Sequence, residues 1–154
     1  MMIEYSRLNS IEDELIREIV IIHENIPSEW RENHQVSDAR IQCRVEMLKD
    51  KVTNPKFYLL MAQTDSGILV GFHWLEIKEE NGMNIGFIVS LWVAQEYRNQ
   101  GIGKAMKVYG ERWAREQGAT ELHTEVHYAN KKMIEYNRIL GFRPRQVIMT
   151  KELK

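Results

Sequence analysis

The sequence Arg98-Asn99-Gln100-Gly101-Ile102-Gly103 joins an apolar stretch, residues 85–93, to an amphipathic stretch, residues 104–117. The first stretch predicts a β-strand and the second predicts a helix, with the glycines in the turn between them. Glycine lets a backbone come close to a ligand, and the N–H groups of a helix's first turn have no partner inside the helix. The order of strand, glycine turn and helix therefore predicts a site for an anion such as a pyrophosphate.

The charge around this turn supports an anionic ligand. Residues 98–107 include Arg98, Lys104 and Lys107 and no acidic residue, whereas the whole chain has a formal net charge of −1. Cations are normally disfavoured near the positive end of a helix dipole, and a bound anion would explain them. A dinucleotide-binding fingerprint is excluded because Met106 stands where its third glycine is required and no early βαβ unit precedes the turn.

Composition indicates a protein that handles a small molecule. A chain of 154 residues is long enough to cover both faces of one sheet, and we expect a single domain over residues 1–154. Its 21 Lys and Arg residues are scattered among 22 Asp and Glu residues, which argues against nucleic-acid and membrane partners. Cys43 is the only cysteine, and neither a signal-peptide pattern nor a long apolar run is present. We therefore expect a soluble, cytoplasmic protein.

The order of the predicted elements indicates a mixed α/β fold. Strands are predicted over residues 3–8, 57–62, 68–77, 83–93, 121–127 and 146–151. Helices are predicted from a cap at Asn9 or Ser10 to Pro27, after a cap at Ser37, and over residues 104–117 and 131–140. A meander of strands followed by strands that alternate with helices predicts a mixed sheet covered on both faces.

Residues 90–105, Ser-Leu-Trp-Val-Ala-Gln-Glu-Tyr-Arg-Asn-Gln-Gly-Ile-Gly-Lys-Ala, resemble the acetyl-CoA-binding motif of the Gcn5-related N-acetyltransferases (GNAT superfamily). Glu125-Val126, Asn130 and Leu140-Gly141-Phe142 are similar to the carboxy-terminal motif of the same superfamily. The resemblance implies a GNAT-like α/β fold with a mixed, mostly antiparallel central sheet and helices on both faces. It also implies an acyltransferase that moves acetyl from acetyl-CoA, by direct attack, to a primary amine of a small molecule or peptide.

The resemblance further implies the residues that bind the donor. The CoA pyrophosphate would be wrapped by the main chain of Arg98, Asn99, Gln100, Gly101, Ile102, Gly103 and Lys104. A bulge near Leu91, Trp92 and Val93 would splay the strand, so that its main chain pairs with the pantetheine arm and holds the acetyl carbonyl. Asn130 would contact the pantetheine arm from the other side.

Acetyl transfer to an amine needs a base, because most amines are protonated at neutral pH. Glu125 is the first candidate, since it stands five residues before Asn130, where the ribosomal-protein alanine acetyltransferases of the superfamily have a glutamate. It would act through a water molecule. His127 is an alternative base, and a solvated carboxylate without a catalytic role is an alternative reading of Glu125.

The reaction also needs an acid for the departing thiolate, and here the sequence departs from the superfamily. A tyrosine acid would stand four residues before Gly141, but that position is Asn137. Tyr136 is the candidate acid, although one residue along a helix turns a side chain by about 100°. Tyr128, a water molecule or unassisted departure are the alternatives. Because of Asn137, a catalytically impaired acyl-CoA sensor or partner domain is the alternative function.

Two further patterns concern ligands other than the donor. His123, Glu125 and His127 alternate and would share one face of a strand, but no Cys or Asp cluster nearby completes a metal site, and we expect no metal. The acids Glu24, Glu29 and Glu32 beside Trp30 favour a cationic acceptor. Residues 113–118 and 145–153 faintly resemble aminoglycoside 6′-acetyltransferases, and the superfamily resemblance is compatible with a homodimer.

Overall fold

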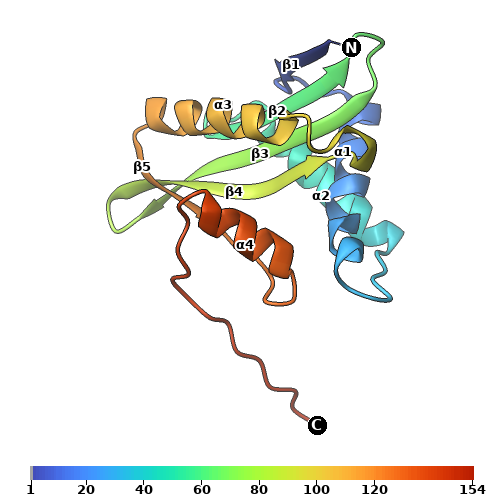
Figure 1. Ribbon diagram of the computed structural model, residues 1–154. Coiled ribbons are helices and arrows are strands. Elements are labelled where there is room, and N and C mark those ends of the chain that lie inside the picture. Colours follow the sequence, from blue (N-terminus) through green and yellow to red (C-terminus); the bar gives the residue numbers. More distant parts are fainter. Residues whose placement is uncertain (1) are drawn as a thin grey trace.

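The computed structural model describes residues 2–154 and has a five-stranded sheet at its centre (Figure 1). The strands are β1 (Ile3–Arg7), β2 (Phe57–Thr64), β3 (Leu69–Glu80), β4 (Met83–Val93) and β5 (Ala119–Thr124), and they lie side by side in this order. The pairs from β1 to β4 are antiparallel, whereas β5 runs parallel to β4. The predicted mixed, mostly antiparallel α/β sheet is confirmed.

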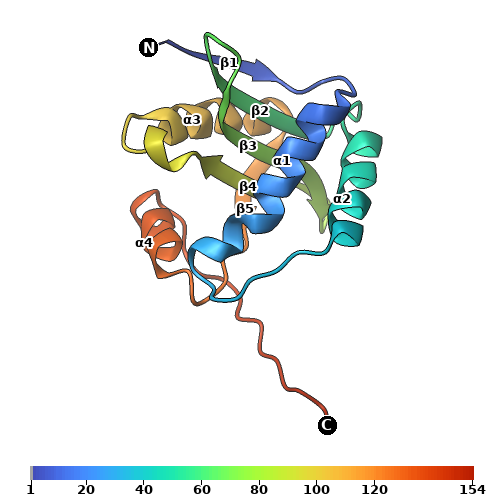
Figure 2. The same cartoon turned by 90° about the vertical axis from the view of Figure 1, so that its right-hand side faces the viewer.

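Helices cover both faces of the sheet (Figure 2). One face carries α1 (Asp13–Asn25) and α2 (Asp38–Lys51), and the other carries α3 (Ile102–Glu116) and α4 (Lys131–Ile139). Two short 3-10 helices, η1 (Ile26–Glu29) and η2 (Gln95–Tyr97), follow α1 and β4. Ser37 begins α2 as predicted, since its hydroxyl accepts the N–H of Arg40 at 3.1 Å.

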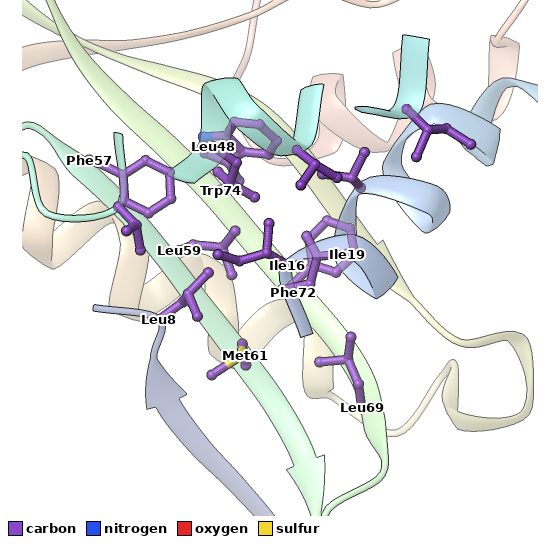
Figure 3. Packing of buried hydrophobic residues seen from close by; sticks show 14 residues of the cluster. Leu8, Ile16, Ile19, Leu48, Phe57, Leu59, Met61, Leu69, Phe72 and Trp74 are labelled. Atoms are coloured by element: carbon purple, nitrogen blue, oxygen red, sulfur yellow. The ribbon is translucent and has the colours of Figure 1, made fainter. Parts of the chain in front are cut away.

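Each face of the sheet has its own apolar core. Below α1 and α2, the completely buried side chains include Ile16, Ile19, Leu59, Phe72 and Trp74 (Figure 3). On the other face, Met106 and Trp113 of α3 pack on Tyr58, Leu60 and Leu75. Because β2 and β3 are buried on both faces, their sequences are almost continuously apolar, and neither strand shows strict alternation.

Helix α3 comes close to the sheet at Gly110. A Cβ atom on this residue would lie 2.8 Å from ring atoms of His73 on β3. The Nδ1–H of His73 donates to the carbonyl oxygen of Met106 at 3.2 Å, and burial lowers the pKa of His73 to about 3, so the ring is neutral. The glycine thus sets how near α3 lies to β3, and this positions the turn at the start of α3.

Two predicted boundaries differ from the structure. Helix α1 begins at Asp13 with Glu12 as its N-cap residue and no side-chain cap, so neither Asn9 nor Ser10 caps it. The strand predicted over residues 121–127 ends at Thr124, because its pairing with β4 ends where Thr124 faces Ile88. Beyond that pair the chain has no backbone partner to continue a strand.

The strand predicted over residues 146–151 is wrong. This segment is extended but belongs to no sheet, and it leaves the body of the protein (Figure 1). Val147, Ile148 and Met149 are exposed by 84%, 81% and 90%. The apolar residues that predicted a strand are therefore present, but the described chain places no neighbouring strand beside them.

Candidate active site

The glycine turn leads directly into the first turn of α3. Asn99 and Gly101 have φ angles of 63° and 85°, in the left-handed region that glycine adopts without strain. Gly101 is the N-cap residue, and no side chain caps the helix, so its first N–H groups are left for a ligand. A Cβ atom on Gly103 would meet only Val93, at 3.7 Å. This end of α3 therefore has the geometry of an anion site.

Arg98 fastens the turn to two other parts of the protein. Its Nε donates to the carbonyl oxygen of Val93 at 2.8 Å, and its Nη2 donates to the carboxylate of Glu29 in η1. The guanidinium is therefore already paired with an acid. The main-chain N–H groups and the exposed Lys104 remain as the groups that would meet an anion.

Strands β4 and β5 separate beside this turn. Their pairing ends at Ile88 and Thr124, whereas β4 continues to Val93. The pairing of β3 with β4 skips Val89, since Trp74 faces Ser90 and Leu75 faces Ile88. The bulge expected near Leu91 to Val93 thus lies at Val89. The last residues of β4 present their main chain to the gap without a partner on β5.

A cavity of about 220 Å³ occupies the gap between the separated strands. Residues from both faces of the sheet line it: His23, Ile26, Pro27 and Trp30 from the α1 side, Ile88–Leu91 from β4, residues 124–127 at and after the end of β5, and Lys107, Asn130, Met133 and Asn137 from the other face. The cavity therefore passes between the strands, so that a ligand on the α3 side can meet one on the α1 side.

Two of the expected donor-site residues have clear local roles. Asn130 is the N-cap residue of α4, and its Oδ1 accepts the N–H of Met133 at 3.3 Å. Its NH₂ group is the part that remains for a ligand. Leu91 lines the cavity, whereas the ring of Trp92 lies 5.6 Å from that of Phe72 in the core below α1. For Trp92, only the main chain can face a donor.

The candidate bases both lie at the cavity. Glu125 is an exposed carboxylate that lines it. The ring of His127 stacks on Trp30 with a centroid distance of 4.7 Å, and its Nδ1 accepts the N–H of Ala129 at 3.1 Å. Because His127 is held by these two contacts, Glu125 is the freer group for proton transfer.

The structure brings Asn137 into the cavity, whereas Tyr136 is not among the described residues that line it. Asn137 is 7% exposed and Tyr136 is 37% exposed. Sequence reasoning missed Lys107 as a cavity residue and used it only as charge near the turn. Its Nζ lies 5.6 Å from the ring centroid of Tyr136 and 5.4 Å from that of Phe142. The sequence did contain a signal for this position, because Lys107 follows Gly103 by four residues and residues so spaced share a helix face.

The acids near Trp30 are mostly neutralised. Glu24 is 5% exposed and accepts Nε–H groups from Arg40 at 2.8 Å and Arg44 at 2.9 Å. Burial alone would raise the pKa of Glu24, but the hydrogen bonds from the two arginines outweigh it and lower that pKa. Glu29 is paired with Arg98. Two of the three carboxylates that predicted a cationic acceptor are therefore already paired with arginines.

Two polar atoms in the cavity wall lack a protein partner. Within residues 2–154, neither the Nδ1 of His23 nor the Oγ of Ser90 makes a hydrogen bond, although both atoms are buried. Burial, helped by the nearby Arg44, lowers the pKa of His23 to about 4, so the ring is neutral. Buried polar groups are normally hydrogen-bonded, so these two residues leave unused hydrogen-bonding capacity beside the cavity.

Comparison with known proteins adds to this geometry. Residues 19–142 match the family model described as the acetyltransferase (GNAT) family. The chain belongs to the GNAT family. This GNAT chain is 32% identical over 84 residues to mycothiol acetyltransferase of Propionibacterium freudenreichii, which covers 54% of this chain and 27% of that protein. It is 31% identical over 101 residues to aminoglycoside N(6′)-acetyltransferase type 1 of Klebsiella aerogenes, which covers 63% of this chain and 66% of that protein.

A solved structure shows the same fold. AAC(6′)-Iy, in complex with the bisubstrate analog CoA-S-monomethyl-acetylneamine, has a TM-score of 0.67 to this GNAT chain at 17% identity, with 100% of both chains covered. The match to the mycothiol acetyltransferase spans about a quarter of that protein's length. Family and fold are therefore shown, whereas the relatives' activities and substrates belong to those proteins.

The two histidines and the glutamate of the metal alternative do not lie on one strand. The Nε2 of His123 lies 2.7 Å from Glu121 Oε2, and β5 ends before Glu125 and His127, so the expected common face is absent. Across residues 2–154, no group of three or more His, Cys, Asp and Glu side chains is placed to hold a metal ion.

Across residues 2–154, none of the helices combines the length and apolar character needed to cross a membrane.

Proposed function

We propose that residues 1–154 act as one acetyl-CoA-dependent N-acetyltransferase domain, which transfers acetyl to a primary amine of a small molecule or peptide by direct attack. The observation that carries this proposal is the cavity between the separated ends of β4 and β5. It connects the side of the sheet with the uncapped start of α3 to the side covered by α1. Membership of the GNAT family and two relatives named as acetyltransferases support the proposal.

The donor would lie on the α3 side. Main-chain N–H groups from Arg98 to Lys104 would bind the CoA pyrophosphate, since they surround the uncapped helix end. The unpaired main chain of Leu91, Trp92 and Val93 would pair with the pantetheine arm, which Asn130 would contact from α4. An N–H group of this stretch would stabilise the oxyanion that forms when the amine attacks.

The amine would approach from the α1 side, between Trp30 and β4. Glu125 would take its proton through a water molecule, a role supported by its place in the cavity wall. The aminoglycoside acetyltransferase relative favours a small polar amine as the acceptor. Tyr136 as the acid stays a prediction.

A panel of amines tests this function. The protein would be incubated with acetyl-CoA and aminoglycosides, amino sugars, polyamines or short peptides, and released CoA thiol would be measured together with the acetyl-CoA dissociation constant. Binding of acetyl-CoA with thiol release for at least one amine class is the expected result. Binding without turnover across the panel would instead favour the acyl-CoA sensor. An absence of acetyl-CoA binding would remove both.

We also propose that the protein forms a homodimer through its C-terminal segment, residues 146–151. The far side of β5 has no strand neighbour within the described chain, and Arg145 contacts Glu121 on β5 at 3.2 Å. The segment that follows carries exposed apolar residues suited to pairing with such an edge in a second copy. Sedimentation should show a dimer, and Val147→Asp with Met149→Asp should give a monomer. A monomeric wild-type protein would contradict the proposal.

A cytoplasmic location also stays a prediction, supported by the single cysteine.

A further inference from the structure

We propose that the ammonium of Lys107 gives the proton to the departing CoA thiolate, the task for which the sequence offers Asn137 at the usual tyrosine position. This inference rests on the proposed acetyl transfer. It assigns a catalytic group on α3, whereas the candidate acid from sequence, Tyr136, lies on α4.

The placement of Lys107 is the first argument. Lys107 follows Gly103 by one helical turn and so faces the same side of α3 as the anion site. It lines the cavity together with Asn137, and both approach it from the face on which the donor would lie. The side chain is therefore within the space that the thioester must enter to meet an amine.

Lys107 is a half-buried cation, and within residues 2–154 it forms no ion pair with an acidic side chain. Glu111, the next acid along α3, lies 3.7 Å from Arg115 in an ion pair. The rings of Tyr136 and Phe142 face the ammonium instead, with its Nζ 5.6 Å and 5.4 Å from their centroids. A cation removed from water is costly unless a negative charge meets it, and the thiolate that forms when the C–S bond breaks supplies that charge.

The surroundings favour proton release from Lys107. Burial lowers its pKa, and Glu111 opposes this only in part, so the ammonium of Lys107 gives up its proton more readily than that of an exposed lysine. His73 approaches from β3 as a neutral ring, because burial keeps its pKa at about 3. Tyr136 faces the ammonium from α4, and Glu125 and His127 line the far part of the cavity.

Glu125 first takes one proton from the ammonium form of the acceptor through water. The neutral amine attacks the thioester carbonyl carbon, a C–N bond forms, and the nitrogen becomes positively charged. That nitrogen loses a second proton to solvent through the same water, the oxyanion collapses, and the C–S bond breaks with its electron pair staying on sulfur. Lys107 Nζ transfers one proton to that sulfur, which yields CoA thiol. Glu125 then releases its proton to solvent, and the neutral lysine regains one from solvent.

Tyr136 then has a positioning role. Its ring and that of Phe142 hold the ammonium by cation–π contact, for which the phenol hydroxyl is not needed. Tyr136→Phe keeps the ring and removes the hydroxyl, which is the part of Tyr136 that could act as an acid. This variant separates the two assignments, because a tyrosine acid requires the hydroxyl and a lysine acid does not.

The first measurement is the pKa of the thiol of bound CoA, followed by the ultraviolet absorbance of the thiolate. The wild-type protein should lower this pKa below that of free CoA measured in the same buffer, Lys107→Met should return it to the value of free CoA or above, and Lys107→Arg should keep it low. Arg112→Met, an exposed change on the same helix, is the matched control. Equal thiol pKa values in the wild-type protein and Lys107→Met would overturn the proposal. This titration needs no turnover, so it is decisive even if no amine is acetylated and the proposed function fails.

The second measurement uses an amine that the wild-type protein acetylates. Lys107→Met should lower kcat by roughly 10²-fold or more, with an unchanged dissociation constant for acetyl-CoA. Its pH profile should lose the fall at high pH that deprotonation of Lys107 causes. Tyr136→Phe should retain most of the wild-type kcat. A large loss in Tyr136→Phe with full activity in Lys107→Met would assign the acid to Tyr136 and refute Lys107.

Discussion

Trp30 and His127 both line the cavity and stack on each other, with ring centroids 4.7 Å apart and planes inclined by 28°. Trp30 follows η1 on the α1 side of the sheet, and His127 follows the end of β5. The wall on the proposed acceptor side is therefore made by two segments that are distant in sequence, and the stacked rings hold them together.

Removing this contact should weaken binding of the acceptor more than binding of the donor. Trp30→Ala should raise the KM for the amine by roughly 2- to 10-fold, the equivalent of one aromatic pair, because the wall loses its fixed position. The acetyl-CoA dissociation constant should not change, since the donor residues lie on the other face. Steady-state kinetics and calorimetry would measure both quantities, and an unchanged KM would show that the acceptor binds elsewhere.

Glu125→Gln should reduce kcat by about 10²-fold at neutral pH if Glu125 is the base. The reduction should shrink as pH rises, because the amine is then neutral without help. A pH–rate profile provides the measurement, with Glu135→Gln, an exposed carboxylate on α4, as the matched control. The same proportional loss at every pH would argue against a proton-transfer role.

Gly103 offers a test of the anion site that keeps the fold. A Cβ atom there would meet only Val93, at 3.7 Å, so Gly103→Ala should fold and bind acetyl-CoA with nearly wild-type affinity. Gly103→Glu should fold equally well but lose affinity by at least about tenfold, because the carboxylate repels the pyrophosphate. Calorimetry with CoA and circular dichroism would compare them. Undiminished CoA affinity in Gly103→Glu would contradict the assignment.

The stability of the protein should fall at acidic pH through His23. Its pKa is lowered by burial from 6.5 to about 4, so the unfolded chain takes up a proton that the folded protein resists. The contribution is complete above pH 6.5 and is lost as pH falls toward 4, with a total of about 3 kcal/mol. Urea unfolding at several pH values should show a smaller loss for His23→Phe. Parallel curves for the two proteins would exclude this role.

The sequence predicted the parts of the fold that depend on local patterns. The glycine turn at Gly101, the cap at Ser37 and the helix around Met106 need only neighbouring residues to be recognised. The limits of β5 and the fate of residues 146–151 depend on whether another strand is available, which no local pattern records. The bulge lies at Val89 and not near Leu91 for the same reason, because pairing with β3 decides its position.

The sequence predicted where the donor-side residues lie in the fold, whereas their role in binding stays a prediction. Gly101, Gly103 and Asn130 lie where the motif places them, at the ends of α3 and α4. The pairing of Glu24 with Arg40 and Arg44 joins two helices, so the charge of Glu24 could not be judged from its own segment. Lys107 and Tyr136 show a related limit, since small rotations on two helices decide which side chain enters the cavity.

The separation of β4 from β5 has a consequence for the order of events. The sheet acts as a partition, and the gap beside Val89 is an opening lined from both of its sides. Two substrates that arrive from opposite sides do not compete for one entrance, and each can leave by the way it came. Separate routes of entry and exit favour a ternary complex in which both substrates are bound at once. Initial rates should then give intersecting lines in a double-reciprocal plot.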